Sequence, residues 1–210
     1  MRIFLLMLCV ALPLLGALAQ KSEAHANNGR LELGVRSTLS LFGTDNTFGF
    51  GTGGQFRLRL LERVNTEWFA DFITNDLSGL GKRNDGHIGW SVMFYLLSPE
   101  KTVVPYLLAG HCFDYTKVMI YNDGFIPFES KKRWSSAVQL GLGTTFNLSE
   151  RTNISLSGQY MLHLGKDIHT HTHEENGKNI LHFKDGGHNH GFEGHVFLTL
   201  GMNFKLADLW

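Results

Sequence analysis

The closing stretch of the chain, Gly194–Trp210, reads GHVFLTLGMNFKLADLW. From Val196 to Leu206 every second residue is apolar, and the residues between them are mostly small or polar. Because successive side chains of a strand point to opposite faces, this segment has one apolar face and one polar face. A run of about ten such residues is long enough for a tilted strand to cross the hydrocarbon of a bilayer. We therefore interpret the stretch as the closing strand of a membrane β-barrel that ends on an aromatic residue.

The same alternation recurs in seven earlier segments, and the connections between them alternate in length. The expected strands are residues 31–41, 55–60, 67–72, 88–96, 104–115, 138–148 and 154–164. The expected long connections are 43–54, 75–86, 116–135 and 165–193, and the short ones are 61–65, 97–102 and 149–153. Short periplasmic turns and long extracellular loops are typical of outer-membrane barrels. The sequence therefore predicts an all-β fold with eight antiparallel strands in up-and-down order.

The two faces of these strands differ in a way that indicates which one meets lipid. The polar face of the first three strands carries charges of both signs, which can pair inside a narrow lumen (Arg36, Arg57, Arg59, Glu67 and Asp71). The other face is rich in the aromatic residues that suit lipid contact and interfacial belts (Phe56, Trp68, Phe72, Trp90, Phe94, Tyr106, Phe146, Tyr160 and Phe204). A soluble barrel of the lipocalin type would instead point its apolar face inward. We therefore expect a transmembrane barrel with a polar lumen that side chains fill, which disfavours an open pore.

The fifth segment is the least regular, because Leu107 and Leu108 are adjacent and either face could be the outer one. We expect Tyr106, Leu108 and Cys112 to point outward.

The first nineteen residues have the features of a secretory signal peptide. Arg2 gives a positive start, Ile3–Leu15 is apolar, and Ala17-Leu18-Ala19 matches a small-x-small cleavage pattern. The alternative, an N-terminal membrane helix, is disfavoured because the apolar run is shorter than the roughly 20 residues that span a bilayer. We expect residues 1–19 to be removed and residues 20–210 to form one barrel domain.

Composition adds two expectations about the mature chain. Its only cysteine is Cys112, so no internal disulfide is expected. The full sequence has 19 basic and 19 acidic residues, a balance that gives no indication of a nucleic-acid partner.

Four features together resemble the small eight-stranded outer-membrane barrels typified by the OmpA membrane domain and OmpX. They are the eight alternating segments, the run Pro105-Tyr106-Leu107-Leu108-Ala109-Gly110, the Gly141-Leu142-Gly143 motif, and the aromatic end of the last strand. The resemblance covers essentially the whole mature chain. It implies an integral protein of a Gram-negative outer membrane, in contact with membrane lipid and lipopolysaccharide.

The resemblance also implies partners and a role. The barrel-assembly machinery would recognise the terminal aromatic residue, although Trp210 lies four residues beyond Leu206 and Asp208 interrupts the apolar alternation. The implied role is structural or one of surface interaction, in which loops 116–135 and 165–193 bind an unknown extracellular ligand. An anchoring role like that of full-length OmpA is not expected, because no peptidoglycan-binding domain follows.

Histidines are concentrated in the last predicted loop. His169, His171, His173, His188 and His190 alternate with other residues, and His182 lies between the two groups. Alternate histidines of an extended segment share a face, and imidazole is a good ligand for zinc, copper or nickel. A zinc-type site formed by those five residues is therefore one hypothesis. A solvated His-rich surface loop with no ligand is the second. A loop whose imidazoles become charged together in mild acid is the third.

An enzymatic site is a further alternative, because some outer-membrane barrels modify lipids or cleave proteins. His163 with Ser157, or His195 with Asp185, could form such a site, but no Gly-x-Ser-x-Gly motif accompanies them. We expect His163 and His195 to belong to the polar network of the lumen, and we predict no catalytic residue and no cofactor other than the zinc considered above.

Overall fold

Eight strands form a closed barrel in the computed structural model, which describes residues 28–42, 48–121, 127–165, 168–175, 178–183 and 192–210. The barrel strands are β1 (Arg30–Phe42), β2 (Phe48–Leu61), β3 (Val64–Asp76), β4 (Gly81–Tyr95), β5 (Val103–Tyr121), β6 (Pro127–Asn147), β7 (Thr152–Leu164) and β10 (Phe192–Asp208). Two short strands, β8 (Thr170–Glu175) and β9 (Lys178–Phe183), form a separate hairpin. The predicted signal peptide, residues 1–19, lies outside the described residues.

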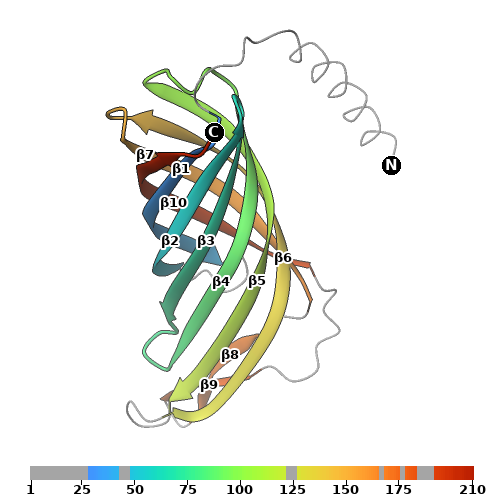
Figure 1. Ribbon diagram of the computed structural model, residues 1–210. Helices are drawn as coiled ribbons and strands as arrows, with labels where there is room; N and C mark the ends of the chain where they lie inside the picture. The colour runs from blue at the N-terminus through green and yellow to red at the C-terminus, as the bar shows by residue number, and fades with distance from the viewer. Residues whose placement is uncertain (1–27, 43–47, 122–126, 166–167, 176–177, 184–191) are drawn as a thin grey trace.

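The predicted eight-stranded antiparallel barrel is confirmed. Each strand pairs with its neighbour in sequence, and β1 closes the barrel by pairing with β10, as Figure 1 shows. In that closing pair Leu33 lies opposite Phe204 and Leu39 opposite Leu198. Because both residues of each pair point outward, the alternation of the last strand continues across the seam.

The two ends of the barrel differ. One end, here called the terminal end, carries the turns at residues 62–63, 96–102 and 148–151 and the end of the chain, where the Leu209 amide donates to the Gly29 carbonyl at 3.0 Å. The opposite end, here called the loop end, carries the connection 77–80, residues 165, 168 and 169, and the hairpin of β8 and β9. The predicted turns at the terminal end are therefore confirmed in place.

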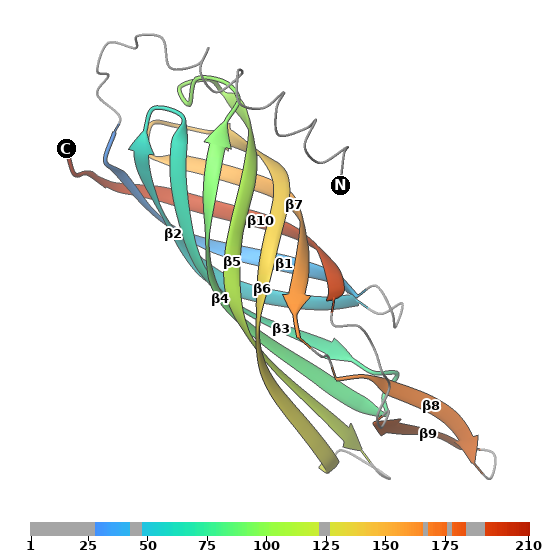
Figure 2. The same ribbon diagram turned by 90° about the vertical axis from the view of Figure 1, so that its right-hand side faces the viewer.

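The strands at the loop end are much longer than the sequence predicted. β5 has 19 residues and β6 has 21, and both continue past the rest of the barrel together with β4, as Figure 2 shows. At about 3.3 Å per residue, β6 is on the order of 70 Å long, whereas about ten residues suffice to cross a bilayer. The predicted connections 75–86 and 116–135 are therefore wrong for most of their length. These segments are strand, but their charged and polar residues interrupt the alternation, and the apolar residues Val118 and Ile120 point inward.

The outer face of the barrel is apolar. Val35, Leu140 and Leu142 are each exposed by 64% or more, and most of the predicted aromatic residues lie on the same face. Among the described residues no helix is long and apolar enough to span a membrane.

The predicted orientation of β5 is wrong. Tyr106, Leu108 and Cys112 point into the barrel and are at most 4% exposed, whereas Leu107 and Phe113 point outward. The inner face of β5 lines an apolar cluster, formed by Met93, Tyr95, Val104, Tyr106 and Leu108. Because both faces of this strand are apolar, alternation could not identify the outer one.

Candidate functional site at the loop end

The hairpin of β8 and β9 is amphipathic, and its apolar face packs onto the extended sheet. Leu181 and Phe183 are each 7% exposed. They join a cluster with three residues from the sheet and its β3–β4 connection, Leu77, Val118 and Ile120. A Cβ atom at Gly81 would lie 2.9 Å from Leu181 Cδ2, so the absence of a side chain there lets the hairpin approach the sheet. The last connection is thus partly a folded element held against β5.

The opposite face of the hairpin carries three histidines. His171 lies directly across from His182, and His173 follows on the same face because side chains of alternate residues point to the same side. The ring centroids are 6.2 Å apart for His171 and His182, 4.8 Å for His173 and His182, and 6.1 Å for His171 and His173. All three side chains are exposed, so the hairpin presents an imidazole surface to its surroundings.

This arrangement differs from the predicted set of metal ligands. His171 and His173 are brought together as expected, but their neighbour across the hairpin is His182, which the predicted set omits. His169 lies one residue before β8, and the predicted residues His188 and His190 lie outside the described residues. The hairpin rings are close to parallel, with interplanar angles of 26° to 33°. Within the described ranges no three histidine, cysteine or acidic side chains are placed to hold a metal ion.

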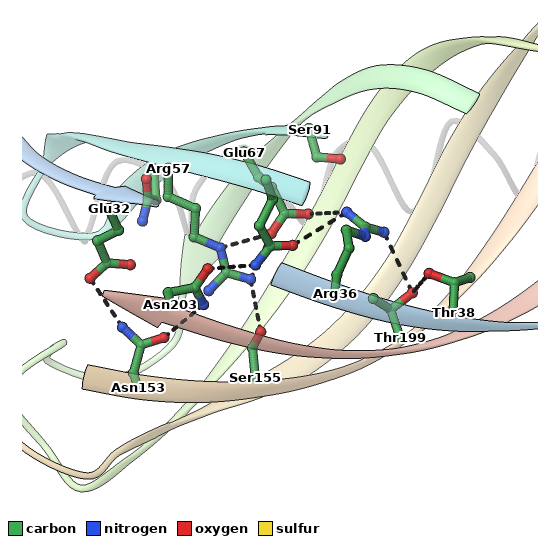
Figure 3. Close-up of polar contacts among 12 residues, drawn as sticks. Glu32, Arg36, Thr38, Arg57, Glu67, Ser91, Asn153, Ser155, Thr199 and Asn203 are labelled. Carbon is green, nitrogen blue, oxygen red and sulfur yellow. Dashed lines mark hydrogen bonds and ion pairs between the residues drawn. The ribbon is translucent and has the colours of Figure 1, made fainter. Parts of the chain in front are cut away.

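The lumen contains a network of charges and amides that connects β1, β2, β3, β7 and β10 (Figure 3). Glu67 is at its centre, with its carboxylate 2.6 Å from Arg57 Nη2 and 3.2 Å from Arg36 Nη1. Arg36 also forms an ion pair with Asp71 at 3.1 Å, and its guanidinium lies 4.4 Å from the centre of the Phe69 ring. The predicted pairing of lumen charges is thus present in the structure.

Amide side chains continue this network toward the terminal end. Gln55 donates to Asn203 at 2.6 Å. Asn203 donates to Asn153 at 2.9 Å, and Asn153 donates to Glu32 at 3.1 Å; Figure 3 labels these last three residues. These four residues come from four different strands. Buried polar groups need such partners, because an unsatisfied donor or acceptor costs about 1–3 kcal/mol. The network therefore fills the lumen and links the strands that form its wall.

A second buried cluster surrounds Asp114 and involves both of the histidines considered for catalysis. His163 Nδ1 lies 2.7 Å from Asp114 Oδ2, and the Cys112 thiol donates to Asp114 Oδ1 at 3.0 Å. The His195 ring is tilted by 57° to that of His163, with ring centroids 4.6 Å apart, and His87 Nε2 lies 3.6 Å from Asp114 Oδ1. All five side chains are at most 3% exposed.

The surroundings of Asp114 fit a structural role. The predicted partner of His163, Ser157, is replaced by Asp114, and the predicted partner of His195, Asp185, lies outside the described residues. A cysteine nucleophile needs nearby positive charge to form a thiolate, whereas this thiol donates to a carboxylate. Sequence reasoning missed Asp114 and His87, since neither stands in a recognisable motif; only their position on the inner side of the alternation could have indicated their location.

Comparison with solved structures shows the same architecture at low sequence identity. A major outer membrane protein from Thermus thermophilus matches with a TM-score of 0.56 and 12% identity, over 87% of this chain and 100% of that chain. The N-terminal β-barrel domain of Pseudomonas aeruginosa OprF matches with a TM-score of 0.52 and 13% identity, over 85% and 100% of the two chains. The fold is that of a small outer-membrane β-barrel.

Neisserial surface protein A gives a similar result, with a TM-score of 0.52 and 13% identity over 87% of this chain and 100% of that chain. No protein-family model matches the chain, and no curated protein sequence matches it significantly. The similarity is therefore one of fold, and it does not assign a function to this chain.

Proposed function

We propose that the chain is an integral outer-membrane protein whose loop end faces the outside of the cell and binds an external partner. The placement in the membrane is supported by the apolar outer face, by the paired charges inside, and by the short turns at the terminal end. A filled lumen favours a role for the surface of the barrel over transport through it.

The observation that carries the binding role is the hairpin packed on the extended sheet. β4, β5 and β6 rise beyond the barrel, and Leu181 and Phe183 fix the hairpin against Val118 and Ile120. Lys131 adds a contact from β6, because its Nζ lies 4.7 Å from the centre of the Phe183 ring. A surface held in this way loses less conformational entropy on binding than a loose loop would, which favours recognition of a partner.

Removal of the hairpin tests the binding role. Cells that produce the protein, and cells that produce a variant in which residues 166–191 are replaced by a short Gly-Ser linker, are applied to surfaces coated with collagen, fibronectin, mucin or heparin. We expect the intact protein to retain cells on at least one coating and the variant to lose that retention at equal surface abundance. Equal retention on every coating would contradict the proposal.

Metal binding at the hairpin is a second candidate function, favoured by the convergence of His171, His173 and His182 on one exposed face. Exposed imidazoles can rotate, so three of them at these separations can turn their nitrogens toward a zinc ion, with His169, His188 and His190 as further candidate ligands.

Calorimetric titration of the detergent-folded protein with zinc tests this candidate. We expect saturable heat that is lost when His171, His173 and His182 are replaced by alanine. The control is His111→Ala, which removes an imidazole from β5, outside the hairpin. An absence of saturable heat, or the same heat from the triple variant, would end the metal hypothesis.

A further inference from the structure

An apolar groove lies on the outer face of the barrel, across β2 to β6. It has a volume of about 330 Å³, within the range of small-molecule sites, which is on the order of 300–1,000 Å³. Its walls are Phe72, Ile88, Phe113, Tyr115 and Trp134. Trp134 is 73% exposed, and its ring centre lies 4.9 Å from that of Tyr115. Large apolar side chains that face away from the lumen therefore form most of its walls, and Asp71 and His87 contribute to its floor.

The space between these walls lies over Gly86, which has no side chain to fill it. Gly86 lies opposite Phe72 on β3 and opposite Tyr115 on β5, so a glycine stands between two aromatic residues in one cross-strand row. A Cβ atom at Gly86 would meet no atom closer than the Tyr115 carbonyl oxygen at 4.0 Å. The space in front of this glycine is open, and glycine at such a position lets a ligand approach the backbone.

The outward residues of β5 and β6 change from apolar to basic toward the loop end. On β5 the order is Phe113, Tyr115 and Lys117, and on β6 Trp134 is followed by Lys132. Aromatic residues mark the border between hydrocarbon and head groups, so the two lysines lie at head-group level while the groove extends into the acyl layer. The apolar part and the charged part of the surface are thus continuous.

Lys117 and Lys132 face each other directly across the β5–β6 pair. Like charges in such a cross-strand pair are destabilising. Within the described part of the chain neither lysine is engaged in an ion pair, and the nearby Lys82 is opposite Asp76. An anion between the two ammonium groups would convert this repulsion into attraction.

We propose that this surface binds one phosphorylated, multiply acylated glycolipid of the lipid A type from the outer leaflet of the membrane. Lys117 and Lys132 bind a phosphate group, and one acyl chain lies in the groove over Gly86 between Phe72 and Tyr115. Charge complementarity selects this occupant, because a zwitterionic phospholipid offers the lysine pair less net negative charge. The inference rests on the proposed placement of the loop end outside the cell, and it does not depend on the partner proposed for the hairpin.

Native mass spectrometry of the detergent-folded full chain, titrated with purified lipid A, tests the charged half of the site. We expect one lipid A to bind saturably and the double variant Lys117→Gln/Lys132→Gln to bind roughly tenfold more weakly, a loss of about 1.4 kcal/mol. The control variant Lys101→Gln/Arg151→Gln removes the same charge at the terminal end and is expected to bind like the wild type. Lipid A stripped of its phosphates is expected to bind the wild type as weakly as lipid A binds the double variant.

Two glycine variants test the apolar half. A Cβ atom at Gly86 has open space around it, and Gly86→Leu, which places a side chain in the groove, is expected to weaken lipid A binding. Gly54→Leu, also on the outer face, has its nearest contact at 3.7 Å and is expected to leave binding unchanged. Heat-modifiable gel mobility shows that each variant is folded. Undiminished binding in the lysine variant or in Gly86→Leu, or equal binding of the dephosphorylated glycolipid, would overturn the proposal.

Discussion

Glu67 shows how individual residues make this interior stable. Two arginines from neighbouring strands share its carboxylate, and all three side chains are buried. Burying charges removes them from water, a cost that is offset only when each has a close partner of opposite sign. The stability of each residue in this group therefore depends on the other two. Loss of the Glu67 carboxylate leaves two buried guanidinium groups with less negative charge nearby.

We predict that Glu67→Gln lowers the free energy of unfolding by about 3–5 kcal/mol, the usual cost of removing one member of a buried ion pair. The measurement is the urea midpoint of the barrel folded into lipid vesicles. Glu100→Gln is the matched control, because Glu100 is 62% exposed and pairs with Arg59 at 3.7 Å. Exposed pairs contribute roughly 0–1 kcal/mol, so the control midpoint should hardly move. Equal effects of the two substitutions would contradict the assigned role of the network.

At this scale the sequence predicted the type of interior but not its particular contacts. Arg36, Arg57 and Glu67 lie on the expected face because their neighbours alternate clearly with apolar residues. Tyr106 was placed on the wrong face, and its true environment explains a motif. A Cβ atom at Gly143 would lie 2.5 Å from the Tyr106 ring, so this glycine makes room for an inward tyrosine on the neighbouring strand. A single sequence does not reveal such a cross-strand fit.

The hairpin of β8 and β9 and the extended ends of β4 to β6 form one structural unit at the loop end. Their contact includes a small apolar cluster, and β8 and β9 pair with each other as a separate two-stranded sheet. A two-stranded hairpin alone is only marginally stable in water, so its attachment depends on the side chains beneath it.

We predict that Leu181→Ala releases the hairpin and makes it susceptible to protease while the barrel stays folded. Large-to-small substitutions at buried positions cost about 2–5 kcal/mol, which is more than a short hairpin can lose. The measurement is limited proteolysis of the folded protein, with the cleavage sites located by mass spectrometry. Ile180→Ala is the control, since this neighbour points to the other face of the hairpin. Equal protection of the hairpin in both variants would show that Leu181 does not hold it.

Sequence patterns identified elements only where lipid imposes alternation. Residues 88–96 and 138–148 alternate because one face meets lipid tails and the other the lumen, and both were predicted to be strands. The continuations at residues 81–87 and 127–135 carry lysines, arginines and serines on both faces, and they read as loops. Their strand structure comes from pairing with β5, a long-range contact that no local pattern records. The predicted set of metal ligands omitted His182 for the same reason. The pairing of His171 with His182 depends on the register of the hairpin, which the local sequence does not reveal.

At the scale of the whole molecule, the barrel combines a sealed interior with two unlike ends. Short turns and the end of the chain are gathered at the terminal end, and the extended sheet with its hairpin stands at the loop end (Figures 1 and 2). The proposed placement puts the loop end outside the cell. Cys112 is buried and leaves the surface of the described residues free of thiols, so single cysteines can report this orientation.

We predict that Asn179→Cys reacts with a membrane-impermeant maleimide on intact cells and that Glu150→Cys does not. Residue 179 is exposed on β9 at the loop end, and residue 150 is exposed in a turn at the terminal end. Both should react after the envelope is permeabilised, which controls for reactivity, and the wild type should stay unlabelled throughout. Labelling of Glu150→Cys alone on intact cells would reverse the orientation.

The length of β6 has a consequence for what the protein can meet. From Trp134 to its first residue, Pro127, the strand extends on the order of 20 Å past the aromatic border. In the proposed placement, the paired sheet holds the histidine face at a fixed level among the sugars of neighbouring glycolipids. Where those sugar chains are short, antibodies and other large binding proteins can reach the histidine face. Where the chains are long, they block access to it. A change in the length of these carbohydrate chains would then make the hairpin accessible or inaccessible without any change in the protein.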